Sequence, residues 1–113
     1  MSGGNWKDAF RAVEEGDYNL LQFHISEGID LNYQHPEILM TLLVTAIKNR
    51  HTQLALLLLE SGADPRLESY FDQMTPLQAA LKFKDDKVIK KLSELGVQAN
   101  LIQKFFFHLM ASG

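Results

Sequence analysis

A repeat of 34 residues is the feature that most limits how this chain can fold. Glycine and alanine each recur three times at that spacing, at Gly28, Gly62 and Gly96 and at Ala12, Ala46 and Ala80. Two residue types that share one period indicate copies of one structural unit. One such unit cannot bury its apolar face alone, so neighbouring units stack on one another. The sequence therefore predicts a stack of three units.

Each unit is expected to contain two short helices joined by a turn, and the start of the third unit indicates this most clearly. Thr75 is a favoured N-cap, Pro76 suits the first helical position, and Gln78 can complete a capping box. Apolar residues then recur at helical spacing, and we expect this first helix to end near Lys84.

The end of the second helix is marked by a glycine in each unit. In the third unit this helix is expected to run from about Lys87 to Leu95, and Gly96 follows it. Glycine adopts the left-handed backbone that closes a helix at little cost, and Gly28 and Gly62 repeat the signal.

The three second helices differ in how apolar they are. The middle one is apolar almost all round ("QLALLLLESG"), as expected of a helix that lies between two neighbours. A terminal helix has a free side, so we expect His24 to face water. Leu56 stands where the other units carry Gln22 and Lys90, which predicts an outward-facing leucine.

The composition is that of one folded domain. The chain has 113 residues, of which 46% are hydrophobic and 22% are charged, and it can bury a core without metals or disulfides. Its net charge of -3 gives no overall attraction for phosphate backbones or anionic lipid. We therefore expect neither nucleic acid nor a membrane as a partner.

The location of the protein is suggested by three weaker signals. The chain contains no cysteine, which excludes a disulfide scaffold and weakly favours a reducing compartment. Its first residues lack the basic-then-apolar order of a signal peptide, and no apolar stretch approaches the length of a membrane span. We expect a soluble, cytoplasmic protein.

The segment between the second and third units resembles the ankyrin repeat. It reads "GADPRLESYFDQMTPLQAA", and ankyrin units close with Gly-Ala-Asp, run through a hairpin and begin again with Thr-Pro-Leu. Because repeats corroborate one another, this signal is strong. The resemblance implies an all-α ankyrin-repeat solenoid of stacked helix-turn-helix units with hairpin-like loops. We expect a single domain at 5–113, with units at about 5–34, 39–68 and 73–100.

The chain departs from the family pattern at two kinds of position. The family usually has His three residues after the threonine, and these places hold Phe10, Val44 and Gln78. Between the two helices the family favours glycine, which is kept at Gly16 but replaced by Arg50 and Lys84 in the next units. Either these two residues accept a positive φ angle or the turn differs.

The C-terminal tail ("NLIQKFFFHLMASG") is too short for a fourth unit. Its apolar residues fit an amphipathic helix at about 101–111, which would cap the exposed end of the third unit. The alternative is a helix that binds a partner, a membrane surface or a second copy of the chain. A membrane role is the weaker option because Lys104 and His108 are its only cationic groups.

No group of residues in the sequence indicates catalysis. His24, His35, His51 and His108 are scattered, without the spacing of zinc ligands. There is no glycine-rich phosphate loop and no nucleophile elbow. We expect no cofactor, no metal and no enzymatic activity, and an enzyme of unknown type remains the outside alternative.

One segment ("KFKDDKVIKK") carries five lysines against two aspartates, a local excess of positive charge. An RNA-binding site would need several aromatic platforms among the cations, and Phe83 is the single candidate. A solvated pair of helices is the favoured interpretation.

The resemblance also implies where a partner would bind. In the ankyrin family the hairpin tips and the first helices form a concave face that grips other proteins. The matching residues that we predict as partner-binding are Ile38, Met40, Lys48, Asn49, Phe71, Asp72, Met74, Lys82 and Phe83. Apolar side chains rimmed by charge have the composition of the centre of an interface.

The second loop carries large apolar side chains, although loops mostly stay at the surface. Tyr70, Phe71 and Met74 either pack under the loop or are free for a partner. We favour recognition for Phe71 and Phe83, and burial for Tyr70.

The sequence thus predicts a non-catalytic module that binds another protein, for example an adaptor or inhibitor. The alternative is a structural protein that forms homo-oligomers, through Leu56 or through the C-terminal segment. The two hypotheses differ in the oligomeric state that they predict at high concentration.

Overall fold

The computed structural model describes residues 5–98, which form six α-helices and no strand. The helices are α1 (Trp6–Glu15), α2 (Tyr18–Ser26), α3 (Leu42–Lys48), α4 (Thr52–Glu60), α5 (Pro76–Lys82) and α6 (Asp86–Glu94). The C-terminal cap expected at about 101–111 lies outside the described residues.

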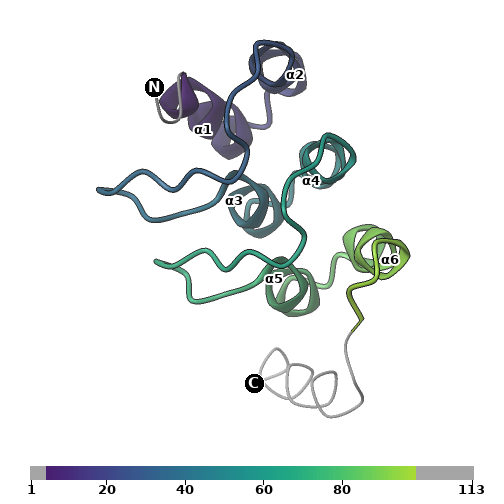
Figure 1. The fold of residues 1–113 in the computed structure, drawn as a ribbon. Coiled ribbons are helices and arrows are strands. Elements are labelled where there is room, and N and C mark those ends of the chain that lie inside the picture. The colour runs from purple at the N-terminus through teal and green to yellow at the C-terminus, as the bar shows by residue number, and fades with distance from the viewer. Residues whose placement is uncertain (1–4, 99–113) are drawn as a thin grey trace.

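The helices pack as three pairs in two layers (Figure 1). One layer holds α1, α3 and α5, and the other holds α2, α4 and α6, with contacts within each pair and between neighbours in a layer. Two long loops, the first hairpin (residues 29–41) and the second hairpin (residues 63–75), extend in the same direction beside the α1, α3, α5 layer (Figure 1). The predicted all-α stack of repeated helix pairs is confirmed.

Capping interactions fix the starts of the first helices. Gln78 N donates to Thr75 Oγ1 at 3.2 Å, and Thr75 N donates to Gln78 Oε1 at 3.0 Å, so the predicted capping box is present. Thr41 caps α3 by accepting from Val44 N at 3.0 Å. The Val44 side chain has no acceptor for the Thr41 N–H, so it cannot complete a capping box. Thr41 N instead donates to Ser69 Oγ in the second hairpin at 3.0 Å. The departure from the family's histidine is therefore compensated by a contact between units.

One repeated geometry ends the first helix of every unit. The carbonyl oxygens of Ala12, Ala46 and Ala80 each accept a hydrogen bond at 2.9 Å from the N–H five residues later. This is the closing bond of a Schellman motif, which requires a left-handed residue just after the helix. That place is taken by Gly16 at φ 78°, Arg50 at φ 64° and Lys84 at φ 57°. Arg50 and Lys84 thus accept the positive φ angle, the first of the two alternatives.

The helix boundaries in the third unit differ slightly from those predicted. The left-handed backbone of Lys84 ends α5 at Lys82, two residues before the expected end. Asp85 accepts from Val88 N at 3.1 Å and caps α6, which therefore begins at Asp86 rather than Lys87. At the other end Gly96, with φ 92°, closes α6 as predicted.

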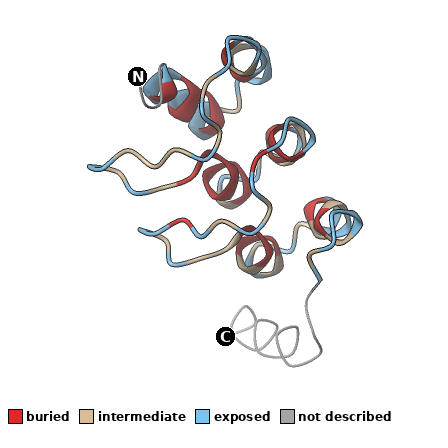
Figure 2. Cartoon of the chain, in the orientation of Figure 1, coloured by how far each residue is buried: buried red, intermediate tan, exposed pale blue. Residues whose placement is uncertain are grey.

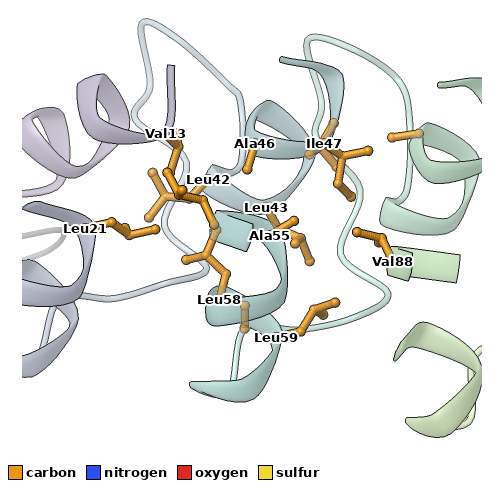
Figure 3. Close-up of a cluster of buried hydrophobic side chains, with 14 of the residues drawn as sticks. Val13, Leu21, Leu42, Leu43, Ala46, Ile47, Ala55, Leu58, Leu59 and Val88 are labelled. Carbon is orange, nitrogen blue, oxygen red and sulfur yellow. The ribbon is translucent and has the colours of Figure 1, made fainter. Parts of the chain in front are cut away.

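The core lies between the two layers, with α3 at its centre (Figure 2). Every residue from Leu42 to Ile47 is buried, because α1 and α5 flank α3 and α4 packs against it. Ala12, Ala46 and Ala80 are each 0% exposed, as expected of small residues where helices approach closely. Side chains from both layers meet in this core, Leu58 of α4 and Val88 of α6 included (Figure 3). Each fully buried aliphatic side chain contributes roughly 1.5–3 kcal/mol.

Two of the outward-facing positions predicted for the second helices are wrong. His24 is 3% exposed, because it lies one helical turn after the buried Leu21 on the inner face of α2. Leu56 is half-buried and packs against the core instead of standing free. It therefore offers less apolar surface to a second copy than the sequence suggested.

An aromatic cluster attaches the first hairpin to α1. Trp6 is buried, and its ring stacks on that of Phe10 with the centroids 4.9 Å apart. The Tyr33 ring meets Trp6 edge-on with the centroids 5.7 Å apart, and the His35 ring stacks on Trp6 with the centroids 6.1 Å apart. Such pairs contribute beyond their buried area, so they hold the hairpin against the stack.

Candidate protein-binding site

The two hairpins share one left-handed position but differ in their hydrogen bonds. In the second hairpin Ser69 and Met74 exchange backbone hydrogen bonds of 2.8 and 3.4 Å, and Gln73 has a φ of 54°. In the first hairpin Leu39 N donates to His35 O at 2.8 Å, and Leu39 has a φ of 56°. Leu39 and Gln73 are related by the 34-residue period, so the extended loops belong to the repeat itself.

Hydrogen bonds join the two hairpins directly. Phe71 N donates to Leu39 O at 2.8 Å. The Gln34 side chain bridges the same pair of loops, since its Nε2 donates to Glu68 O at 3.0 Å and its Oε1 accepts from Tyr70 N at 3.1 Å. The tips are therefore parts of one continuous edge.

A buried polar network anchors that edge to α3. Lys48 Nζ lies 2.6 Å from Asp72 Oδ1, and Ser69 Oγ donates to Asp72 Oδ2 at 2.8 Å. The Asp72 side chain is only 5% exposed, and each of its two oxygens has one of these partners inside the protein. Of the predicted partner-binding residues, Lys48 and Asp72 thus hold the hairpin in position.

The aromatic residues of the second tip point away from the core. Tyr70 is 57% exposed and Phe71 is 68% exposed. The predicted burial of Tyr70 is wrong, because the interior place beside it is taken by Ser69, whose hydroxyl serves the polar network. Met74 is half-buried under the hairpin and packs against the core.

Two apolar residues of the first hairpin are less exposed than these aromatic rings. Ile38 and Met40 are half-buried and pack against the core, and Lys48 Nζ lies 3.9 Å from Met40 Sδ. Both remain partly accessible beside the exposed tip.

The other predicted residues lie at the turns between paired helices. Asn49 is exposed, and its Nδ2 donates to Thr45 O at 2.9 Å. Phe83 is half-buried, with Arg50 Cζ and Lys82 Nζ each 5.7 Å from its ring centroid. Both distances fall within the range of cation–π contacts.

The nine predicted residues therefore form two groups. One lies at the hairpins (Ile38, Met40, Lys48, Phe71, Asp72 and Met74), and the other lies at the turns between paired helices (Asn49, Lys82 and Phe83). Phe71 and Phe83 flank opposite ends of α5, a helix of seven residues whose ends lie about 10 Å apart. The sequence did not single out Arg50 or Tyr70 as site residues. Arg50 lies 34 residues before Lys84, and this equivalence could have drawn attention to it. No local sequence pattern signals the exposure of Tyr70.

Two features are absent from residues 5–98, a cluster of metal ligands and a helix that could span a membrane. This part of the chain contains no cluster of three His, Cys, Asp or Glu side chains that could hold a metal ion. None of its helices has the length and apolar character needed to cross a membrane.

Stacked helix pairs with hairpins projecting from one layer define a helical repeat protein. More particularly, the family model described as ankyrin repeats (3 copies) matches residues 9–103, and the chain belongs to the ankyrin repeat family. Ankyrin repeats are in general modules of protein–protein interaction.

Two viral proteins are similar to this chain. It is 32% identical over 94 residues to ankyrin repeat protein FPV014 of Fowlpox virus (strain NVSL), and 31% identical over 103 residues to ankyrin repeat protein FPV222 of the same virus. These regions cover 83% and 88% of this chain but 21% and 14% of the relatives. The chain thus spans about a fifth or less of each relative.

Proposed function

We propose that this chain binds a partner protein through the tips of its two hairpins and the adjoining surface of α3, without catalysis. The observation that carries the proposal is the pair of exposed aromatic side chains, Tyr70 and Phe71, on a tip that hydrogen bonds hold in place. A role as an adaptor or an inhibitor fits such a surface.

The energetics favour recognition over an incidental exposure. Large aromatic residues are enriched among the few side chains that supply most of the binding energy of an interface. A tip fixed by Gln34 and by the Lys48–Asp72 pair loses little conformational freedom when a partner docks. Ile38 and Met40 add a half-buried apolar border to the same surface.

The test compares exposed aromatic residues at two places. The variant Tyr70→Ser with Phe71→Ser should lose at least tenfold in affinity for its partner, because hot-spot aromatics contribute that much or more. Phe23→Ser is the matched control, since Phe23 is 54% exposed on α2, away from the hairpins. Proteins retained from a lysate are identified by mass spectrometry, and the purified partner is then titrated against all three proteins.

Equal retention of one partner by the tip variant and by the control would contradict the proposal. Thermal melting is recorded in parallel, and the tip variant should melt as the parent does because both rings are exposed. Phe83→Ser is measured separately, since Phe83 is half-buried and lies at the other end of α5.

Self-association remains the second prediction, through the C-terminal segment, because Leu56 packs against the core. Light scattering of the full chain over a range of concentrations tests it, and a monomer at the highest concentration counts against it. We also propose a cytoplasmic location, which the cysteine-free sequence favours weakly.

A further inference from the structure

The turns between paired helices in the second and third units line an open hollow of about 280 Å³. Its wall includes Ile47, Arg50 and Thr52 from one unit and Phe83, Lys84 and Asp85 from the next. It lies at the end of α5 opposite to the second hairpin, so it is separate from the proposed docking edge.

Two of its cationic side chains stand on left-handed backbone. Arg50 has a φ of 64° and Lys84 a φ of 57°, where the first unit has Gly16. A residue with a side chain costs roughly 1 kcal/mol more than glycine in this conformation. Leu39 and Gln73 carry the same strain in the hairpins, and what sets Arg50 and Lys84 apart is that both line one hollow.

The hollow combines an apolar wall with a cationic rim. The accessible apolar surface comes from the half-buried ring of Phe83, which has Arg50 Cζ and Lys82 Nζ each 5.7 Å from its centroid, while the fully buried Ile47 lies beneath it. Arg50 is held there by a hydrogen bond of 3.3 Å from its Nη1 to Phe83 O. The guanidinium is therefore fixed beside the hollow.

The acidic groups nearby offset this positive charge only in part, because Arg50, Lys84 and Lys87 line the hollow against Asp85 and Asp86. Asp85 Oδ2 accepts from Thr52 Oγ1 at 2.7 Å, and Asp85 Oδ1 accepts from Val88 N at 3.1 Å, so both of its oxygens are occupied. Asp86 and Lys87 also line the hollow and offset each other. The surrounding segment 82–91 has five lysines and two aspartates, in a chain whose net charge is -3.

We propose that this hollow, defined here as the turn pocket, receives one apolar side chain from an acidic segment of a partner protein. The hollow is open to solvent and cannot bury most of the surface of a small molecule, so a single protruding side chain is the better fit. Arg50 and Lys84 on the rim, with Lys82 over the neighbouring Phe83 ring, would attract acidic residues on either side of that anchor. Single-stranded RNA fits less well, because stacking needs several open aromatic faces and Phe83 is the only aromatic residue of the pocket.

The test uses a short synthetic peptide in which one leucine is flanked by aspartate and glutamate. Titration is followed by backbone amide NMR shifts of the full chain. We expect saturable binding, with the largest shifts at Ile47, Arg50, Phe83 and Lys84. Replacing the peptide leucine with alanine should weaken binding about tenfold, and added salt should weaken it further.

The decisive variant is Lys84→Gly, which removes one rim charge and also relieves the left-handed strain. It should bind the peptide roughly three- to tenfold more weakly while melting at the same or a higher temperature than the parent. Lys7→Gln is the control, because Lys7 is an exposed lysine on α1, and it should bind like the parent.

Four results would overturn the proposal: no saturable binding, shifts spread evenly over the lysines of α6, indifference to the peptide leucine, or unchanged binding by Lys84→Gly. A single-stranded RNA oligomer that competes with the peptide and binds more tightly would assign the turn pocket to nucleic acid instead. The proposal does not rest on the hairpin tips, because Tyr70→Ser with Phe71→Ser should leave peptide binding unchanged.

Discussion

Lys48 and Asp72 form an ion pair across two units, with Nζ and Oδ1 2.6 Å apart and the Asp72 side chain 5% exposed. The lysine comes from the end of α3 and the aspartate from the second hairpin. Ser69 Oγ donates to the other carboxylate oxygen and accepts from Thr41 N. One carboxylate thus connects a hairpin tip to the first helix of the preceding unit.

Asp72→Ala should lower the free energy of unfolding by roughly 2 kcal/mol, because it leaves Lys48 and Ser69 without their acceptor in a part-buried place. Urea unfolding followed by circular dichroism measures the change. Asp8→Ala is the control, since Asp8 pairs with Arg11 at 3.5 Å with both side chains more than half exposed, and it should cost less than about 1 kcal/mol. Equal losses in the two variants would contradict the anchoring role.

Gly16→Ala should destabilise the protein by more than backbone strain alone. Gly16 has a φ of 78°, and an added Cβ would lie 2.8 Å from His51 Cε1. Gly62 has a φ of 101° with nothing within 4 Å of such a Cβ, so Gly62→Ala should show only the strain of roughly 1 kcal/mol. Thermal melting of both variants separates the two effects.

The contact with His51 has its own check. His51→Ala added to Gly16→Ala should recover part of the loss, even though His51→Ala alone removes the 3.1 Å contact between His51 Nε2 and Glu14 O. Strict additivity of the two changes would mean that the ring and the new methyl group do not meet.

Gln73→Gly should raise the free energy of unfolding by up to about 1 kcal/mol, because Gln73 is exposed and holds a φ of 54° in the second hairpin. Lys90→Gly on the exposed face of α6 should have the opposite sign and lower stability by about 1 kcal/mol. Urea unfolding of both proteins gives the comparison. A destabilised Gln73→Gly variant would show that the left-handed residue costs nothing here.

His24→Leu should stabilise the protein by about 1 kcal/mol, because neither ring nitrogen of this buried side chain has a hydrogen-bond partner among the described residues. His35→Leu should not stabilise it, since His35 Nδ1 accepts from Glu37 N at 3.1 Å in the first hairpin. Differential scanning calorimetry measures both. A lower melting temperature for His24→Leu would indicate that the imidazole has a polar partner after all.

The sequence alone determined the features that depend on neighbouring residues. The period of Gly28, Gly62 and Gly96 specified the stack, and these glycines all have positive φ angles in the structure. The capping box of Thr75 and Gln78 formed as predicted, because its two hydrogen bonds lie within four consecutive residues. The shared period also marked Ala12, Ala46 and Ala80 as equivalent positions, and all three are buried in the structure.

Tertiary packing decided which side of each segment is covered. His24 is inside because α2 packs against α1 and α4, and Leu56 is half-covered because α4 lies between α2 and α6. Tyr70 is outside because Ser69, a smaller residue, supplies the hydroxyl that Thr41 and Asp72 need. The periodicity of a sequence predicts which residues share one face of a helix. Which of those faces is exposed to water depends on the neighbouring units that pack against it.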